Sequence, residues 1–303
     1  MKVQKVETGL SLPSDQNAPI ELKSGDLTAS FIDNSAYGKT HKSGYNGISE
    51  LRHSHQDSSI FVPSYAGFNL EHVFGGDSLA PLFEPRVNPM EIKKISDSEV
   101  MLHQKELPLS HVESWTNFKL TEPHYIDITF RYIIHGDSFF EHNYAGLFWA
   151  SYIHAPSDIS INFLGNDIGE KNYSWIKAIS PKHGELSSHK HESDKYSMYT
   201  ADNFNVTLAS HFSKYQYKNP YYYGVFHNMV LAYLFDIPDD QILRFSQSPT
   251  GGGSHNPAWD FYIVNPDFEI GKEYSFNVRM VYKPFKNSEE ILNEYDVWHD
   301  LRN

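Results

Sequence analysis

The sequence contains no cysteine. This absence excludes disulfides, thiol nucleophiles, zinc ribbons and iron–sulfur clusters. A chain of 303 residues can nevertheless bury roughly 75% of the surface of its unfolded state, so it needs no covalent or metal link in order to fold. Apolar residues make up 40% of the sequence, which argues against intrinsic disorder.

Positive charge is also scarce. The sequence has 25 Lys and Arg against 38 Asp and Glu, a formal net charge of −13 at pH 7. Without a basic run there is little to neutralise phosphates, so we expect neither nucleic acid nor an anionic membrane as a partner. The 17 His would remove much of this negative charge in mild acid, because an unperturbed imidazole titrates near pH ~6.5.

Long apolar runs are missing as well. No stretch approaches the ~18 apolar residues of a membrane span. Residues 1–9 lack the apolar core of a signal peptide, so the chain as given is expected to be cytoplasmic, or periplasmic or secreted if it has been trimmed. The sequence leaves the oligomeric state open.

Aromatic residues, in contrast, are abundant. Twenty Tyr, twenty Phe and five Trp make up 15% of the chain. Aromatic side chains favour β-strands. Tyr and Trp also line sugar-binding clefts, where a flat apolar face meets a polar rim. Either an aromatic β-core or a sugar site would account for this composition.

Short apolar runs separated by Gly, Pro, Asn, Asp and Ser recur along the chain, which is typical of strands. In residues 274–282, Tyr and other apolar side chains alternate with Ser, Asn and Arg, which predicts an antiparallel strand with one exposed face. The segments predicted as strands are 27–33, 59–63, 99–103, 112–120, 125–134, 146–153, 159–164, 175–179, 204–209, 223–235, 242–246, 259–264 and 274–282.

Helix signals are confined to the C-terminus. Residues 288–301 carry an apolar stripe of Ile291, Tyr295, Trp298 and Leu301, and Asn287 or Ser288 can cap the first turn. The sequence therefore predicts an all-β fold: a single domain over residues 1–303, a large antiparallel β-supersandwich on which residues 286–303 pack as a helix. Residues 180–200 are polar and rich in turn formers, and we expect a long surface loop that could cover a site.

Two histidine-rich segments could hold a metal. His53 and His55 would share one face of a strand, and His183, His189 and His191 lie in the expected surface loop. Metal sites usually need three or four ligands, and neither segment predicts a complete set. We therefore interpret both as solvated loops and predict no metal and no cofactor.

Polar groups interrupt apolar segments at three further places. Glu71 and His72 lie within the segment 69–76, and Pro85 and Pro89 flank Arg86 in a stiff loop that could aim its guanidinium into a cleft. A surface pairing of Arg86 with Glu84 is the alternative. The other candidates are His142 and Tyr144 at the start of an apolar strand that also holds Trp149, and Tyr222 and His227 in an aromatic strand. A histidine at the mouth of a buried strand suits proton transfer, although it could equally be a core histidine with a backbone partner.

The most function-like segment is 244–261. It begins with Arg244, and three consecutive glycines, 251–253, let backbone approach a ligand closely. Asn256, Trp259 and Asp260 follow, which together provide an amide, a stacking face and a carboxylate. The glycine run is no phosphate loop, because no Lys-Ser/Thr follows it. A plain hairpin turn is the alternative interpretation.

These segments resemble the galactose mutarotase-like (aldose 1-epimerase-like) superfamily over roughly residues 60–285, in a bacterial carbohydrate-processing branch. Glu-His-Asn-Tyr-Ala-Gly-Leu at 141–147 is similar to the epimerases' Asn-His-Thr-Tyr-Phe-Asn-Leu, and Phe-Glu-Pro-Arg at 83–86 to their Gly-Arg-x-x-Asn-Arg. Ala-Trp-Asp-Phe at 258–261 stands where the family has Cys-Leu-Glu-Thr-Gln. The chain differs in having Asp in place of that Glu and in lacking the Asn-Arg pair.

The resemblance implies a sugar-binding cleft on a concave sheet, with a mono- or oligosaccharide as ligand. It implies that Arg86 grips the sugar, that His142 acts as an acid, and that Asp260 is the general base. The second family histidine would be His227, with His211 as the alternative. Glu71, His72, Tyr144, Trp149, Tyr222, Arg244, Asn256 and Trp259 complete the expected substrate-binding set.

Several functions fit these residues. An epimerase would use Asp260 and a His, whereas a glycosidase would need a second carboxyl from Glu71, Glu113 or Glu141. A polysaccharide lyase would use a Tyr or His base, with an Arg that neutralises the uronate. A non-catalytic carbohydrate-binding module would keep the aromatic side chains and need no acid–base pair. Acid–base chemistry at a saccharide is the preferred interpretation, and these alternatives remain open.

Overall fold

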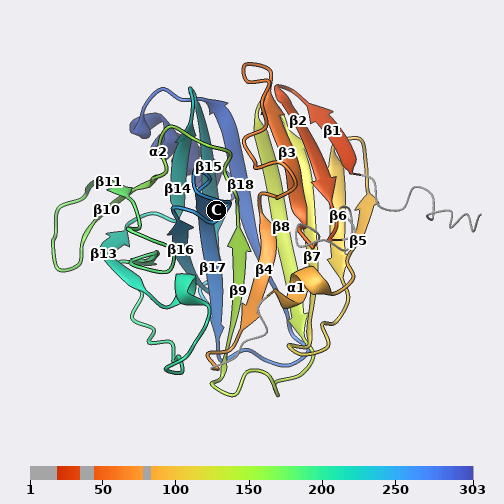
Figure 1. Cartoon of the computed structure of the whole chain (residues 1–303), viewed down its shortest axis with the longest axis vertical. Helices are drawn as coiled ribbons and strands as arrows, with labels where there is room; N and C mark the ends of the chain where they lie inside the picture. The colour runs from red at the N-terminus through yellow and green to blue at the C-terminus, as the bar shows by residue number, and fades with distance from the viewer. Residues whose placement is uncertain (1–18, 35–43, 78–82, 303) are drawn as a thin grey trace, which may run out of the picture.

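Two layers of strands pack face to face, as the alternation of apolar and polar side chains predicts (Figure 1). The computed structural model describes residues 19–34, 44–77 and 83–302. The front layer in Figure 1 consists, in spatial order, of β1 (Ile20–Ser24), β2 (Leu27–Ile32), β3 (Gly47–His53), β4 (Asn69–Phe74), β9 (Tyr144–Ala150), β17 (Ala258–Pro266) and β16 (Ile242–Ser248).

The back layer continues the sheet of β4, β9, β17 and β16, whereas β1, β2 and β3 form a separate three-stranded sheet. The back layer consists of β14 (Tyr221–Phe226), β15 (Met229–Asp236), β18 (Glu273–Pro284), β8 (Tyr125–Ile134), β7 (Val112–Thr121), β6 (Glu99–Gln104) and β5 (Glu91–Lys94). The two layers are joined at one edge by β12 (Ser188–His191), β13 (Phe212–Tyr217) and β10 (Ile161–Asp167), with β11 (Ser174–Ala178) paired to β10. Apart from the parallel pair β12–β13, the paired strands are antiparallel. The predicted antiparallel β-sandwich is confirmed.

The main hydrophobic core fills the space between the layers. Trp149 of β9 packs against Phe130 of β8 and Phe276 of β18, with ring centroids 4.8 and 5.4 Å apart. Trp259 and Tyr222 are fully buried in the same core. The expectation that Trp149, Trp259 and Tyr222 line a sugar cleft is therefore corrected: their strand positions turn them toward the interior, where their large apolar area is removed from water.

Strong two-residue periodicity made β6, β7, β8 and β18 of the back layer predictable. β8 spans the predicted residues, and the predicted 274–282 lies within β18 with its apolar face buried. Three predicted strands are wrong. Residues 223–235 form two strands joined by a turn at His227, residues 204–209 contain only a 3₁₀ turn (Thr207–Ala209), and residues 59–63 contribute isolated bridges only.

The predicted surface loop at 180–200 is also wrong in part. It contains β12, which pairs with β13 and β16, and Ser188 and His189 are buried. His189 bonds through Nδ1 to the Ser213 hydroxyl at 2.7 Å and through Nε2 to the Gln247 amide at 3.0 Å. These two partners satisfy both ring nitrogens, and burial lowers the pKa of His189 to about 3. His189 is thus a neutral histidine of the core. It is neither part of a solvated loop, as expected, nor a metal ligand.

The C-terminal helix α2 (Ser288–Asp300) forms as predicted, with the Asn287 side chain accepting a hydrogen bond from the Glu290 backbone N–H at 2.9 Å. Ile291, Tyr295 and Trp298 bury against the outer face of β14 and β15. Leu301, the fourth residue of the expected stripe, is exposed because the helix ends before it. No helix in the described ranges is long and apolar enough to cross a membrane.

Candidate functional site

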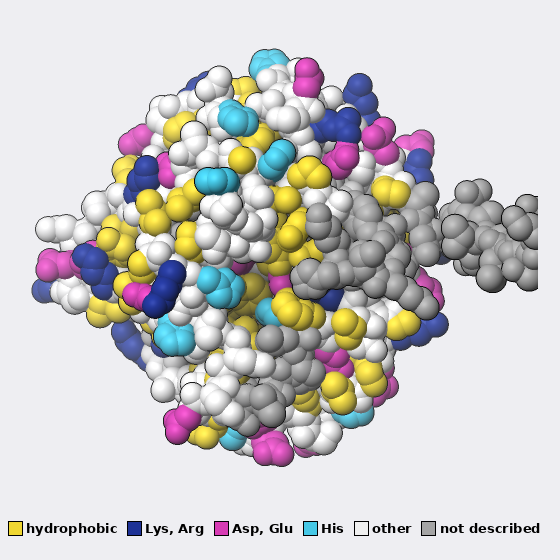
Figure 2. All heavy atoms as spheres, in the orientation of Figure 1, with side chains coloured by type: hydrophobic (Ala, Val, Ile, Leu, Met, Phe, Trp, Pro, Cys, Tyr) yellow, Lys and Arg dark blue, Asp and Glu magenta, His cyan; other side chains and the backbone are white. Residues whose placement is uncertain are grey.

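A pocket opens on the outer face of the front layer, over β4, β9 and β17. Its cavity volume is about 230 Å³. Figure 2 shows this face hollowed near its centre, where hydrophobic, histidine and acidic side chains meet. The lining combines aromatic side chains with five titratable groups: Glu71, His72, Arg86, His183 and Asp260. This mixture makes the pocket the candidate site.

An irregularity in β4 brings Glu71 and His72 to the same pocket. Leu70 pairs with Trp149 of β9 and His72 pairs with the adjacent Phe148, so Glu71 has no partner in the ladder. A β-bulge of this kind breaks the alternation of faces. Both side chains consequently line the pocket, whereas regular pairing would have directed one of them into the main core.

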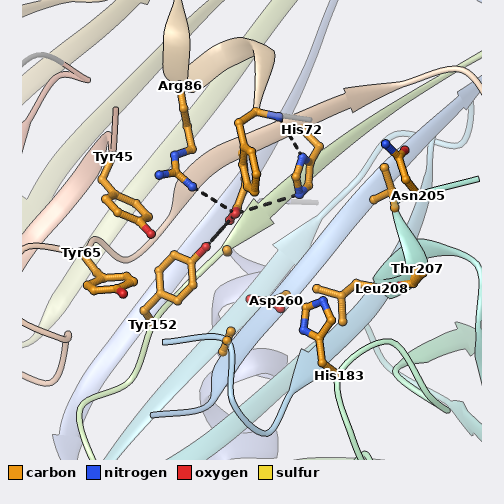
Figure 3. A pocket seen from close by; sticks show the side chains of 16 residues that line it. Tyr45, Tyr65, His72, Arg86, Tyr152, His183, Asn205, Thr207, Leu208 and Asp260 are labelled. Atoms are coloured by element: carbon orange, nitrogen blue, oxygen red, sulfur yellow. Dashed lines mark hydrogen bonds and ion pairs between the residues drawn. The ribbon is translucent and has the colours of Figure 1, made fainter. Parts of the chain in front are cut away.

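Glu71 is the centre of a buried hydrogen-bond network (Figure 3). The Tyr152 hydroxyl lies 2.7 and 2.6 Å from its two carboxylate oxygens, and Arg86 donates from Nη1 to Oε1 at 3.4 Å. Burial raises the pKa of Glu71, while the charge of Arg86 and the bond from Tyr152 act in the opposite direction. The pocket therefore holds this carboxyl beside a compensating cation.

Arg86 lies on the one-turn helix α1 (Glu84–Val87), where a stiff loop was expected. Its guanidinium stacks on the ring of Tyr45, 3.8 Å from Cζ to the ring centroid, and is almost fully buried. The alternative of a surface pair with Glu84 is excluded, since the Glu84 carboxylate accepts the Leu109 backbone N–H at 2.8 Å. Arg86 Nε is buried and has no hydrogen-bond partner among the described residues.

His72 is neutral in this site. The Phe83 backbone N–H donates to its Nδ1 at 3.3 Å, which places the ring proton on Nε2, 4.0 Å from Glu71 Oε1. Burial and the charge of Arg86 lower the pKa of His72 to about 3. At neutral pH this side chain can donate a hydrogen bond from Nε2, but it carries no charge.

Asp260 lies at the floor of the pocket, with none of its surface exposed to water. The Ser151 backbone N–H donates to Oδ1 at 3.2 Å, and Oδ2 has no partner in the described part of the chain. Burial, and then the charge of Glu71, raise the pKa of Asp260 well above its ordinary value. Burial therefore favours the neutral acid, whereas the sequence resemblance implied an ionised general base.

The other wall of the pocket carries His183 and Gly251. His183 Nδ1 lies 2.9 Å from the Ser248 hydroxyl, and burial lowers the pKa of its imidazole. Asn256 does not line the pocket. It braces the glycine turn by donating from Nδ2 to the Gly252 carbonyl at 3.0 Å and accepting the Ala155 N–H at 2.9 Å. Its expected role in binding substrate is corrected to one in holding the turn.

The predicted trio of His142, His227 and Asp260 does not assemble, because Asp260 alone of the three lines the pocket. His142 Nε2 pairs with Asp77 at 2.9 Å, and its ring packs on Tyr199. His227 is the first residue of the β14–β15 turn, with a positive φ of 53°. Each histidine takes a structural position because the chain turns at it, and not because it points into a cleft.

Tyr144 and Arg244 also lie outside the pocket lining. The Tyr144 hydroxyl donates to the Tyr199 carbonyl at 2.6 Å. Arg244 is fully buried and pairs with Asp194, with 2.8 Å between Nε and Oδ2. Arg244 thus does not pair with Asp260, and no cationic side chain among the described residues forms an ion pair with Asp260.

Tyr45, Tyr65, Tyr152 and His183 line the pocket but were not predicted. The three tyrosines form an aromatic wall with ring centroids 4.8 to 5.4 Å apart. They come from loops and strand ends with no local motif, and only the tertiary fold brings them together. Among the described residues, no group of three His, Asp or Glu side chains is arranged to hold a metal ion.

No protein-family model matches the chain, and no curated protein matches its sequence. Its structure is similar to that of a proposed aldose 1-epimerase from Escherichia coli K12, with a TM-score of 0.45, 9% identity, and coverage of 88% of this chain and 99% of the other. It is also similar to heparan sulfate lyase HepC from Pedobacter heparinus (TM-score 0.43, 10% identity, 90% of this chain and 34% of that one).

A third similar structure is 4-alpha-glucanotransferase from Thermococcus litoralis, with a TM-score of 0.43, 11% identity, and coverage of 90% of this chain and 38% of that one. This chain therefore spans little more than a third of the length of the lyase and the glucanotransferase. At these TM-scores the likeness describes strand arrangement in outline and assigns no activity.

Proposed function

We propose that the pocket binds one neutral saccharide unit and catalyses proton transfer at its anomeric centre. The observation that carries this proposal is the pair of buried carboxyls with unequal environments: Glu71 lies beside Arg86, whereas Asp260 has no cation. The Arg86 cation favours the ionised form of Glu71, whereas burial favours the protonated form of Asp260. Paired groups whose pKa values are pushed apart are the usual arrangement for acid–base catalysis.

The lining supports a neutral sugar as the ligand. Tyr45, Tyr65 and Tyr152 supply flat apolar faces with hydroxyl rims, which suit a sugar ring. The charge of Arg86 is already balanced by Glu71, and His72 is neutral, so the described lining of the pocket offers no spare cation for a uronate. This balance argues against the polysaccharide lyase alternative. The volume of about 230 Å³ lies below the common range of about 300–1,000 Å³ for ligand sites, which favours a single ring over a polymer.

The proposed reaction is the interconversion of anomers. The Glu71 carboxylate accepts the proton of the anomeric hydroxyl while the Asp260 carboxylic acid protonates the ring oxygen. The bond between the anomeric carbon and the ring oxygen breaks, and the open-chain aldehyde forms. Rotation and the reverse proton transfers close the ring with the opposite anomer, so no co-reactant is consumed.

The test is the exchange rate between anomers of neutral aldoses, measured by NMR with wild type, E71Q and D260N. We expect wild type to accelerate exchange of at least one aldose and each variant to reduce the rate by about 10²–10⁴-fold. E113Q is the matched control, because Glu113 is a carboxylate of β7 on the other layer that binds His103 and His135. Equal rates in all four proteins, or no acceleration by wild type, would contradict the catalytic proposal.

A sugar-binding module without catalysis remains the second candidate. The complete burial of Asp260 favours it, since proton transfer requires hydrogen-bond reach to the ligand. Calorimetric binding without acceleration of anomer exchange would establish this candidate. Absence of binding for every neutral monosaccharide would exclude both.

A further inference from the structure

One wall of the pocket is a long segment without strand pairing. Residues 194–209, called here the wall segment, lie between β12 and β13, and four consecutive residues of it, Asn205 to Leu208, line the pocket. Apart from the 3₁₀ turn Thr207–Ala209, the segment has no regular secondary structure. Its position therefore depends on side chains that bind its backbone.

Arg244 of β16 makes the most extensive of these contacts. Its Nε lies 2.8 Å from Asp194 Oδ2 and its Nη2 lies 3.4 Å from Asp194 Oδ1, a two-point pairing. Nη2 also donates to the Tyr196 carbonyl at 2.9 Å. Both charged side chains are removed from water, with 0% and 2% of their surface exposed. The guanidinium thus fixes the first three residues of the wall segment to the sheet.

Further contacts hold the rest of the segment. Tyr144 donates to the Tyr199 carbonyl, and the hydroxyls of Ser188 and Ser246 donate to the Leu208 carbonyl at 2.6 and 2.8 Å. The segment is consequently tied at both ends, and the pocket-lining residues lie near the second end. The Ala201 N–H also donates to the Gly76 carbonyl at 2.8 Å, so loss of the first tie would loosen the segment from its first residue up to the Tyr199 and Ala201 contacts, without breaking any strand pair.

A buried ion pair is poor evidence of a purely stabilising role. Desolvation of two charges offsets most of their attraction, and well-packed apolar residues often serve as well for stability. The Tyr196 carbonyl also accepts from Lys190 Nζ at 3.1 Å, but an apolar pair could supply neither the second donor from Arg244 nor a fixed angle of the chain at Asp194. The geometry of the Arg244–Asp194 pair therefore suits a role in positioning the wall segment.

We propose that Arg244 and Asp194 are a positioning pair that fixes the wall segment over the pocket and so sets the affinity for the ligand. The effect on ligand affinity rests on the proposed function, whereas the effect on the position of the wall does not. Asp260 is fully buried beneath the pocket. A displaced wall segment would change which side chains the ligand contacts, so the position of this segment matters for binding.

The test compares R244K with R279K. Lys at 244 keeps a charge beside Asp194 but cannot also reach the Tyr196 carbonyl. Arg279 forms a similar two-point pair with Asp127 on the back layer, at 2.7 and 2.9 Å, and is the matched control. We expect R244K to raise amide hydrogen exchange in residues 195–208, and to weaken binding of the monosaccharide identified for wild type by about tenfold. R279K should do neither.

A second variant distinguishes local loosening of the wall segment from a general loss of folding. The double substitution R244M/D194L removes both charges together and leaves no buried charge unpaired. We expect near-normal melting temperature, with faster exchange confined to residues 195–208. Unchanged exchange in these residues, in R244K and in the double variant, would overturn the proposal. So would a rise in exchange spread equally over the whole chain. If exchange rises locally but wild type binds no monosaccharide, the proposed function fails while the positioning role stands.

Discussion

At the scale of single residues, the protonation of Asp260 is the feature on which the site depends. Its folded-state pKa is raised, so the folded protein holds a proton that the unfolded chain releases near pH ~4. The free energy of unfolding of wild type should therefore fall as pH rises above that value, until the folded-state pKa is passed. Asn in place of Asp260 cannot ionise, so D260N should gain stability relative to wild type with rising pH.

Urea unfolding of both proteins at several pH values from about 4 to 9 measures this difference. A gap between D260N and wild type that stays constant across the range would show that Asp260 has an ordinary pKa in the folded state. D260N should not lose stability through an unpaired cation, because Arg244 already pairs with Asp194.

His189 has the opposite effect at acid pH. Burial holds its pKa at about 3, so the folded protein keeps it neutral while the unfolded chain binds a proton below about pH 6.5. Stability from this residue is present above that value and is lost as pH falls toward 3. H189Q should flatten the decline in the free energy of unfolding between pH ~6.5 and ~4, measured by urea unfolding. A decline as steep as in wild type would contradict this assignment.

At the scale of elements, the β14–β15 turn gives a clean test of a residue that the sequence placed in the active site. His227 has a positive φ of 53°, the conformation that glycine adopts most easily, at the first position of a two-residue loop. H227G should be more stable than H227A by about 1 kcal/mol, because only the Ala variant keeps a Cβ in this conformation.

Thermal or urea unfolding compares these two variants, and ligand binding provides the second readout. Both should bind saccharide as wild type does, since His227 does not line the pocket. Loss of binding or of anomer exchange in both variants would contradict this prediction and show that His227 contributes to the site. Equal stability of the two variants would show that the turn carries no conformational strain.

The clearest strand predictions from the sequence are those with strict alternation. β8 and β18 alternate apolar and polar residues because one face meets the core and the other meets water. β4 was not predicted, because all six of its residues are buried and its polar Glu71 and His72 suggest a loop. Its bulge, which places both side chains in the pocket, depends on pairing with β9 and has no local sequence signal.

At the scale of the whole molecule, the sequence predicted the charged side chains of the pocket better than its aromatic side chains. Arg86, Glu71, His72 and Asp260 were all named, because a charged group within an apolar segment is costly to bury and usually has a purpose. The aromatic residues were misassigned. Trp149 and Trp259 fill the core, whereas the pocket uses Tyr45, Tyr65 and Tyr152. Which face a strand residue occupies, and which loops cover it, is decided by the packing of two layers.

The central claim is that one pocket brings Glu71 and Asp260 to the same saccharide. Its most direct test is NMR of protein labelled with ¹³C at the Asp and Glu carboxyl carbons, titrated with neutral monosaccharides, with signals assigned through E71Q and D260N. The account predicts that a binding sugar shifts the signals of Glu71 and Asp260 together, that the pKa of Asp260 lies well above its ordinary value, and that Asp127 on the back layer is unaffected by the sugar. Sugar binding that leaves both signals in place, or an Asp260 that titrates near pH ~4, would contradict it.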